Sequence, residues 1–368
     1  MRLPGHHLAT WLTARGDKVA YLSAPVSPWH FLSGARRKEA RRRWGLEGPR
    51  GEWRSEKLFT YIPRTLVPIH RQWPFDGDMS WRWSEAATMP RASGVLRAAG
   101  FDQPDFLLIQ NWQLPALADV IRPRSLVVSI EDDLAEFPEM PRVIVRRHTE
   151  VLRRAKLVTA TAESLRAETE KLGVRQTMLM PNGVDTARFR RPENLPARPA
   201  DMPEGRVAVY IGALDSWFAE DLLAEVAATL SDWKFVLIGP PRAAMKKLRA
   251  MPNVIFIGPR AQEAAPPYLW HATAGIIPFS RTPLIESVAP LKLFEYLAAG
   301  LPVVATKWRE IERLSPPAKL VASSAEFVAA LRQSESTPTA QRRYFAEWAA
   351  GYDWDRIFSR FYDKVKSL

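Results

Sequence analysis

Lys292 and Glu295 are the two charged residues of an otherwise apolar segment, SVAPLKLFEYLAAGLPVVAT (287–306). Pro290 comes just before them, and proline fits the first turn of a helix because its missing N–H is not needed there. The unpaired N–H groups of that turn and the helix dipole attract anions. Lys292 would add a full positive charge in the same turn. The pattern therefore predicts a diphosphate site at the start of a helix that opens with Pro290.

Glu295 lies three residues after Lys292, which places both side chains on one helical face. A carboxylate cannot bind phosphate, but it accepts hydrogen bonds from neighbouring hydroxyl groups such as those of a ribose. Diphosphate and ribose side by side describe a nucleoside diphosphate. The alternative is a local Lys–Glu pair on an ordinary surface helix.

A second group of carboxylates, Asp132 and Asp133 preceded by Glu131, follows the apolar run LVVSI (126–130). At the carboxyl end of a strand, these side chains would face the ligand edge of an open α/β sheet. Crowding and partial desolvation raise the pKa of a carboxyl group toward the range of a general base. We predict that Asp132, or else Asp133, is such a base. The alternatives are a helix cap and a divalent-cation site.

The elements that must position these residues alternate between strands and helices. Most of the predicted strands are continuous apolar runs, as in parallel sheets covered on both faces. They are 18–22, 59–62, 106–109, 126–130, 157–161 and 177–180, then 207–211, 235–238, 254–257, 275–278, 303–305 and 320–322. We therefore predict an α/β fold of two Rossmann-like, doubly wound domains that face each other across a cleft.

The proline-rich stretch 181–205 separates the two sets of strands and reads as a linker. We predict two domains, 1–183 and 184–343, with the nucleoside diphosphate site in the second. The aromatic-rich segment 344–368 is predicted to be a helix that either crosses back to the first domain or caps the second. Because the chain opens on a helical pattern, we also expect the first strand of the N-terminal domain to be missing.

The net charge of +12 suggests an anionic partner, although codon bias is an equal explanation. The absence of cysteine excludes disulfides, thiolate metal sites and a cysteine nucleophile. No apolar run is long enough to span a membrane. A soluble, cytoplasmic protein is therefore expected, either free or peripherally bound to the inner face of the cell membrane.

Basic and aromatic residues gather in the segment 27–50, where they suit an anionic lipid surface. The alternatives are a solvated basic helix and an RNA site; we expect no nucleic-acid partner. The residues predicted to contact a membrane are Trp29, Phe31, Arg36, Arg37, Arg41, Arg42 and Arg43.

Several segments together resemble bacterial glycosyltransferases of the GT-B fold, nearest to family 4-like enzymes and exopolysaccharide glucuronosyltransferases. The resemblance covers the chain from about residue 18 to its end. It implies that the domain 1–183 binds the acceptor, to which the basic segment 27–50 would contribute, and that the domain 184–343 binds the nucleotide sugar. It rests on ESVAPLKLFEYLAAGLPVVAT (286–306), LMPNGVDTARF (179–189), VYIGALDSWFAEDLL (209–223), FVLIGPP (235–241), PNVIFIGPR (252–260), GIIPFSR (275–281) and SIEDDLAEFPEMP (129–141).

The resemblance implies that Lys292 binds the donor diphosphate and Glu295 the ribose. Gly212 would let the backbone approach the phosphates, and the stretches around Arg260 and Phe279 would flank the nucleobase. The donor would be a nucleotide sugar, with UDP favoured. No cofactor or metal is implied, since the helix end and the lysine would do the electrostatic work of a cation.

Ser287 marks a departure from retaining relatives, which carry a glutamate eight residues before the helix glutamate. Glu286 lies one place earlier, and the loop could absorb that offset. The departure favours inversion, for which the resembling enzymes use an aspartate of the acidic loop as base. The resemblance implies sugar transfer to a glycan or polyprenyl-linked acceptor in cell-surface polysaccharide synthesis. The rival interpretations are a nucleotide-sugar epimerase and a non-catalytic binding protein.

Overall fold

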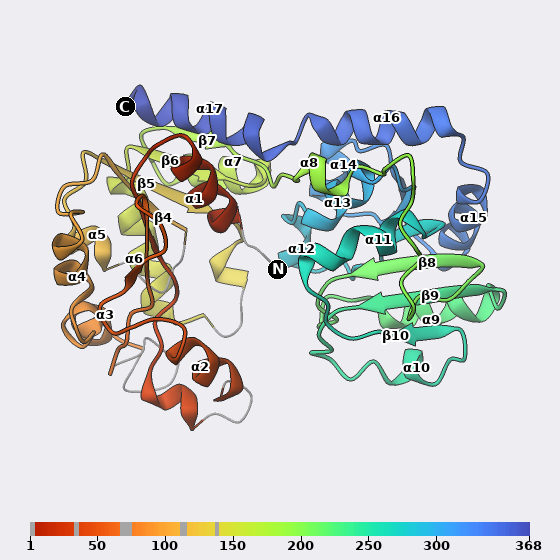
Figure 1. The fold of residues 1–368 in the computed structure, drawn as a ribbon, viewed down its shortest axis with the longest axis horizontal. Helices are drawn as coiled ribbons and strands as arrows, with labels where there is room; N and C mark the ends of the chain where they lie inside the picture. The colour runs from red at the N-terminus through yellow and green to blue at the C-terminus, as the bar shows by residue number, and fades with distance from the viewer. Residues whose placement is uncertain (1–3, 33–36, 67–75, 111–115, 137–139) are drawn as a thin grey trace. The chain divides into compact units, whose positions relative to one another are not determined.

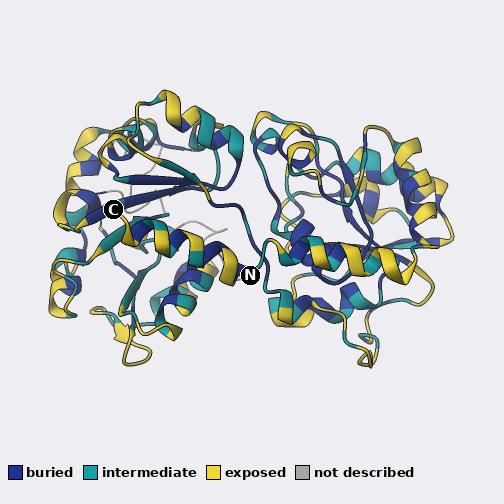
Figure 2. Cartoon of the chain, turned by 90° about the horizontal axis from the view of Figure 1, so that it is seen from above, coloured by how far each residue is buried: buried dark blue, intermediate teal, exposed yellow. Residues whose placement is uncertain are grey.

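The computed structural model describes residues 4–32, 37–66, 76–110, 116–136 and 140–368. These form two compact units, which we call the first and the second unit (Figure 1). The first unit comprises the described part of Leu3–Met180 together with Phe358–Leu368, and the second comprises Pro181–Ile357. In both units the strands are more buried than the helices, whose outer faces are exposed (Figure 2).

A six-stranded parallel sheet forms the centre of the second unit, in the order β10-β9-β8-β11-β12-β13. Its strands are β8 (Arg206–Ile211), β9 (Trp233–Ile238), β10 (Val254–Phe256), β11 (Ala274–Ile277), β12 (Val303–Thr306) and β13 (Lys319–Val321). The strand order reverses between β8 and β11. Such a switch point is where open α/β sheets bind ligands, at the carboxyl ends of the strands.

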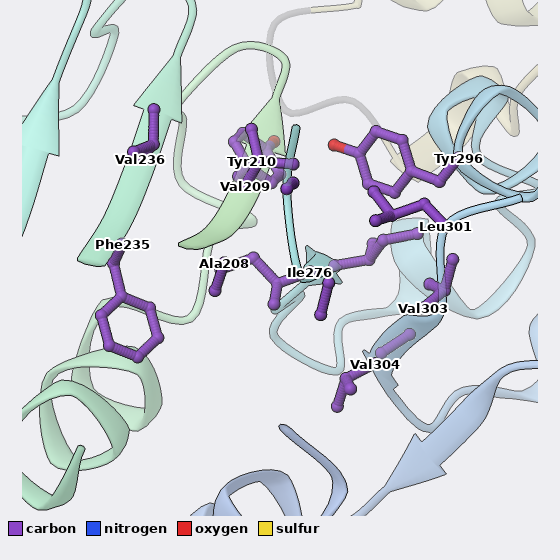
Figure 3. Close-up of a cluster of buried hydrophobic side chains, with 14 of the residues drawn as sticks. Ala208, Val209, Tyr210, Phe235, Val236, Ile276, Tyr296, Leu301, Val303 and Val304 are labelled. Carbon is purple, nitrogen blue, oxygen red and sulfur yellow. The ribbon is translucent and has the colours of Figure 1, made fainter. Parts of the chain in front are cut away.

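Helices surround this sheet, and apolar side chains fill the space between. They are α8 (Thr186–Phe189), α9 (Glu220–Thr229), α10 (Lys246–Arg249), α11 (Ala265–Trp270), α12 (Pro283–Glu286), α13 (Leu291–Ala298), α14 (Arg309–Leu314), α15 (Ser324–Ser334) and α16 (Thr339–Ala350). Helix α13 lies against β12 and α16, while α15 lies against α9, β12 and β13. Tyr210 of β8 and Tyr296 of α13 are both fully buried in this core (Figure 3).

The first unit contains two sheets. One has the order β1-β3-β2 and the other the order β4-β5-β6-β7. The strands are β1 (Val19–Leu22), β2 (Glu52–Trp53), β3 (Leu58–Tyr61), β4 (Phe106–Ile109), β5 (Ser125–Ile130), β6 (Leu157–Ala160) and β7 (Thr177–Leu179). All pairs are parallel except β2 with β3.

All twelve predicted strands are present, within about two residues at their ends. The sequence missed β2, which is only two residues long and exposed on both. The first unit also differs from a single doubly wound sheet, because β1 and β4 are edge strands of separate sheets. Among the described residues no strand pairs with both β1 and β4.

The helices of the first unit are α1 (Pro4–Ala14), α2 (Arg37–Trp44), α3 (Asp78–Ala86), α4 (Ala92–Ala98), α5 (Leu117–Val120), α6 (Arg142–Arg154) and α7 (Glu163–Lys171). Short 3-10 helices, η1 (Pro28–Phe31) and η2 (Leu134–Glu136), occur in its loops, and η3 (Gln262–Ala264) in the second unit. Within the described ranges, no helix is both long and apolar enough to cross a membrane.

The C-terminal segment consists of two helices rather than one, α16 and α17 (Trp354–Lys366), with the break at 351–353. Helix α16 packs on α13 of the second unit. From Phe358 onward α17 belongs to the first unit, where the Trp11 ring lies 6.0 Å from that of Phe358 and 5.8 Å from that of Tyr362. The Tyr362 hydroxyl also donates to Asp17 at 3.2 Å.

Candidate functional site

Two glycines shape the loops that follow β8 and β9, next to the switch point. The N–H of Gly212 donates to the Ile238 carbonyl at 2.8 Å. A Cβ on Gly239 would lie 1.8 Å from the Gly212 carbonyl oxygen, so that only glycine fits there. A Cβ on Gly212 would lie 3.0 Å from Cε and 3.2 Å from Nζ of Lys292. The missing side chain at 212 therefore makes room for the lysine.

Helix α13 begins at Leu291, with Pro290 as its N-cap in extended conformation. This corrects the prediction that Pro290 opens the helix, by one residue. Two side chains hold the preceding turn: Nδ2 of Asn182 donates to the Ala289 carbonyl and Nε1 of Trp308 to the Val288 carbonyl, both at 2.8 Å. Within the described part of the chain, no side-chain hydrogen bond caps the start of this helix. Its first turn thus keeps the properties of an anion site.

The ammonium of Lys292, the second residue of α13, lies over two aromatic rings. Nζ is 4.5 Å from the centre of the Phe279 ring and 4.8 Å from that of the Tyr210 ring. Burial lowers the pKa of Lys292 to about 8, while the carboxylate of Glu295 acts in the opposite direction. A cation is therefore held at the switch point at an electrostatic cost, which an anionic ligand would relieve.

Glu295 is 6% exposed, one turn further along α13. The Nε2 of Gln262 donates to its Oε1 at 3.2 Å. Burial raises the pKa of Glu295, against the opposing effects of Gln262, Lys292 and Arg188. Sequence reasoning missed Gln262, which lies in no recognised motif and reaches the carboxylate only through the fold.

Glu286, the residue next to Ser287, has two hydrogen-bond partners. Its carboxylate accepts from Nε of Arg281 at 3.0 Å and from the backbone N–H of Arg309, the first residue of α14, at 2.8 Å. Ser287 is buried and its hydroxyl donates to the Leu284 carbonyl at 3.1 Å. Whether the loop absorbs the one-residue offset stays a prediction.

Two residues expected to flank a nucleobase have other contacts. Phe279 is 4% exposed and packs at 5.6 Å against the Trp308 ring. That the stretch around it flanks the nucleobase stays a prediction. The guanidinium of Arg260 pairs with Asp201 at 2.6 Å, and the Tyr268 hydroxyl donates to the same carboxylate.

In the first unit, the acidic residues follow β5 as predicted. Glu131 is the most perturbed of them: burial, followed by the charge of Asp132, raises its pKa to about 7. Burial also raises the pKa of Asp132. Gln110, which follows β4, donates from Nε2 to Glu131 Oε1 at 3.4 Å, and the Thr161 hydroxyl donates to the Glu131 carbonyl at 2.8 Å. Asp133 is the third member of the group, directly before η2.

No group of three or more His, Asp or Glu side chains within the described ranges is arranged to hold a metal ion.

The basic segment of the first unit is only partly available to a partner. Arg42 pairs with Glu39 at 2.6 Å, and Arg43 reaches the Ser23 hydroxyl at 3.2 Å and the Ala24 carbonyl. Arg37 and Arg41 are exposed on α2, whereas Arg36 lies outside the described residues.

Exposed apolar side chains lie close to α2. Trp29 of η1 is 51% exposed and Leu32 is 78% exposed. Phe31 is half-buried against Trp44, with the ring centres 5.6 Å apart. We call Trp29, Leu32, Arg37 and Arg41 the exposed basic patch.

Residues 205–334 match the family described as Glycosyl transferases group 1. The chain is 31% identical over 192 residues to the putative teichuronic acid biosynthesis glycosyltransferase TuaH of Bacillus subtilis (strain 168). The aligned region covers 50% of this chain and 48% of that protein. The chain thus spans about half the length of this curated relative in the match.

Two solved structures are similar over almost the whole chain. The sucrose-phosphate synthase from Thermosynechococcus elongatus has a TM-score of 0.66 at 16% identity, covering 98% of this chain and 91% of that one. Anabaena Alr3699/HepE in complex with UDP has a TM-score of 0.67 at 16% identity, covering 100% and 97%. These findings confirm the predicted α/β fold and the resemblance to GT-B glycosyltransferases.

Proposed function

We propose, from the Glycosyl transferases group 1 domain at residues 205–334, that this chain transfers a sugar from a nucleotide sugar to an acceptor in cell-surface polysaccharide synthesis. The similarity to TuaH, a putative teichuronic acid biosynthesis glycosyltransferase, supports polysaccharide synthesis as the setting. The solved complex of Alr3699/HepE with UDP supports a UDP sugar as donor. The acceptor in this proposal is a glycan or a polyprenyl-linked sugar.

The observation that carries the proposal is the ammonium of Lys292, which lies beside Gly212 at the switch point of the sheet. An anion bound at the start of α13 would meet both this charge and the helix dipole. In sugar transfer the leaving group is a nucleoside diphosphate, on which negative charge grows as the bond to the sugar breaks. Lys292 and the helix would stabilise that charge without a metal.

Glu295 and Gln262 would hold the ribose in this proposal. The Gln262 amide fixes one carboxylate oxygen of Glu295, which orients the group as an acceptor of hydroxyl hydrogen bonds. A ribose joined to a diphosphate at Lys292 would reach Glu295 because the two residues are one turn apart on the same helix.

For the chemical step we propose direct displacement with inversion. Asp132, or Asp133, would remove the proton of the acceptor hydroxyl as its oxygen attacks the anomeric carbon and the nucleoside diphosphate leaves. Burial raises the pKa of Asp132, which makes it a better proton acceptor than a solvated carboxylate. The hydrogen bonds of Glu286 with Arg281 and Arg309 support inversion, since they hold this carboxylate on other partners than a sugar.

The exposed basic patch supports the proposal that the protein acts at the inner face of the cell membrane. Exposed indole and leucyl side chains suit the interfacial region of a bilayer, and guanidinium groups suit the phosphates of anionic lipids. A lipid-linked acceptor would be available at such a surface.

Calorimetry with UDP, GDP and ADP at pH 7 tests the donor site. We expect UDP to bind the wild-type chain and Lys292→Met to weaken this binding about 30-fold or more, the loss expected when one partner of a desolvated charge pair is removed. Lys319→Met removes an exposed lysine of the same sheet and should leave the affinity unchanged. Equal affinities in the two variants would contradict the proposed site.

A further inference from the structure

Two aromatic residues contact the Lys292 ammonium from the ends of neighbouring strands. Tyr210 is the penultimate residue of β8, and Phe279 follows β11 by two residues. Both rings lie within 5 Å of Nζ, inside the range at which a ring face attracts a cation. Gly212 borders the same lysine, where a Cβ would crowd Cε. We call Tyr210, Gly212 and Phe279 the lysine cradle.

Hydrogen bonds fix the two aromatic residues. The hydroxyl of Tyr210 donates to the Ala213 carbonyl at 2.8 Å, and its ring packs edge-on against Phe218 at 4.9 Å. The backbone N–H of Phe279 donates to Oγ1 of Thr306 at 3.0 Å, and that hydroxyl donates to the Phe279 carbonyl at 2.7 Å. Because the rings cannot move easily, they determine where the flexible lysine side chain ends.

Core packing alone would not require aromatic residues at these positions. An aliphatic side chain fills apolar volume, but it offers no negative face to an ammonium group. The cradle also explains how a cation is kept in a desolvated place. Burial opposes the charged form of Lys292, and two ring faces return part of the stabilisation that water would have supplied.

We propose that Tyr210 and Phe279 are positioning residues that keep the Lys292 ammonium charged and directed at the diphosphate of the donor. The identity of the anion rests on the proposed function, whereas the effect of the rings on Lys292 does not. The two parts can therefore fail separately.

The first experiment follows Lys292 itself, without a ligand. The full chain is labelled with 13C at lysine Cε, and the signal of Lys292 is assigned by its absence in Lys292→Met. We expect Phe279→Leu to move the titration midpoint of Lys292 to lower pH by about half a pH unit or more, since a lost ring face is worth that much. Phe279→Tyr keeps a ring face and should leave the midpoint in place.

The neighbouring titratable groups do not obscure this measurement. Tyr210 and Tyr296 face the site from β8 and α13, and burial raises the pKa of each above its usual value, so both stay neutral between pH 7 and 9. Glu295 is the charged group that faces Lys292 from the same helix, and it is present in every variant compared.

Phe256→Leu is the matched control. Its ring lies 4.6 Å beneath the guanidinium of Arg249 in the same unit, so this variant removes a cation-contacting ring elsewhere. We expect it to leave the Lys292 midpoint unchanged. Should Phe279→Leu fail to fold, Phe279→Met supplies a flexible non-aromatic side chain, and Tyr210→Leu removes the other ring.

The second experiment measures UDP affinity by calorimetry at pH 7. We expect Phe279→Leu to weaken binding about three- to tenfold and Phe279→Tyr to stay within about twofold of the wild type. If the folded ring-deleting variants match Phe256→Leu in both the midpoint and the affinity, the cradle is refuted. A shifted midpoint in a chain that does not bind UDP would retain the cradle and refute the proposed donor site.

Discussion

Replacing Lys292 by methionine should stabilise the unliganded protein while it weakens UDP binding. Methionine fills much of the space of the lysine stem but carries no charge. In the fold the pKa of Lys292 falls from its ordinary 10.5 to about 8, mainly because the group is buried. Each pH unit corresponds to about 1.4 kcal/mol, so the charged lysine costs the folded state up to about 3 kcal/mol at pH 7. We expect Lys292→Met to recover about 1–3 kcal/mol of this cost.

The sign of the pH dependence follows from proton counting. Below pH 8 the lysine is charged in both the folded and the unfolded state, and the cost of burying it is fully present. Between pH 8 and 10.5 the unfolded state binds the extra proton, so the wild type gains stability relative to the variant as the pH rises. The advantage of Lys292→Met should therefore shrink by about 2 kcal/mol between pH 7 and 9.5.

Urea unfolding followed by tryptophan fluorescence at pH 7 and pH 9.5 measures this difference. Lys319→Met is the control, because an exposed lysine carries no comparable burial cost. A Lys292→Met variant that is no more stable than the wild type at pH 7, or whose advantage does not change with pH, would refute the claim that the ammonium is buried at a cost. Such a result would also remove the argument that a bound anion relieves the cost of burying the Lys292 ammonium.

Two further predictions concern the first unit. Asp132→Asn should reduce sugar transfer by about a thousandfold or more, as expected for loss of a general base, and leave UDP affinity within about twofold; full activity, measured as UDP release in the presence of acceptor, would exclude Asp132 as the base. Trp29→Ser with Arg41→Glu should release the protein from vesicles containing anionic lipid in a flotation assay, whereas Arg42→Glu should have a smaller effect because Arg42 is already paired with Glu39. Equal flotation of both variants would place membrane contact elsewhere.

The strands could be predicted from the sequence because each is a short apolar run between turn residues. A run such as Val207–Ile211 is apolar at every position, and in the structure it is β8 in the middle of a parallel sheet. Such a segment is buried on both faces of a parallel sheet, so its continuous apolar pattern predicts a strand without knowledge of its neighbours. The two-residue strand β2 has no such pattern and could not be found in this way.

The pair Lys292 and Glu295 could also be proposed as a site from local information, because helical spacing and the preceding proline are properties of the segment alone. The residues that contact this pair could not be predicted from local information. Gln262 lies 33 residues before Glu295, and Tyr210 lies 82 residues before Lys292. Gln262 lies in no recognised motif, and the segment 209–223 that contains Tyr210 pointed to Gly212 rather than to this ring. Such contacts arise only when separate strand ends and loops meet at one edge of the sheet.

Roles that depend on competition between partners were likewise decided by the tertiary structure. Glu286 could reach a sugar or a helix start as far as the sequence tells, and the fold places it on Arg281 and Arg309. From the sequence, Phe279 could flank a nucleobase or pack inside, and in the fold its ring lies 4.5 Å from the Lys292 ammonium. The chain's own residue pattern determined which segments become strands and which helix carries charge. The three-dimensional arrangement decided what each charge and ring contacts, because those energies depend on distance and burial rather than on sequence order.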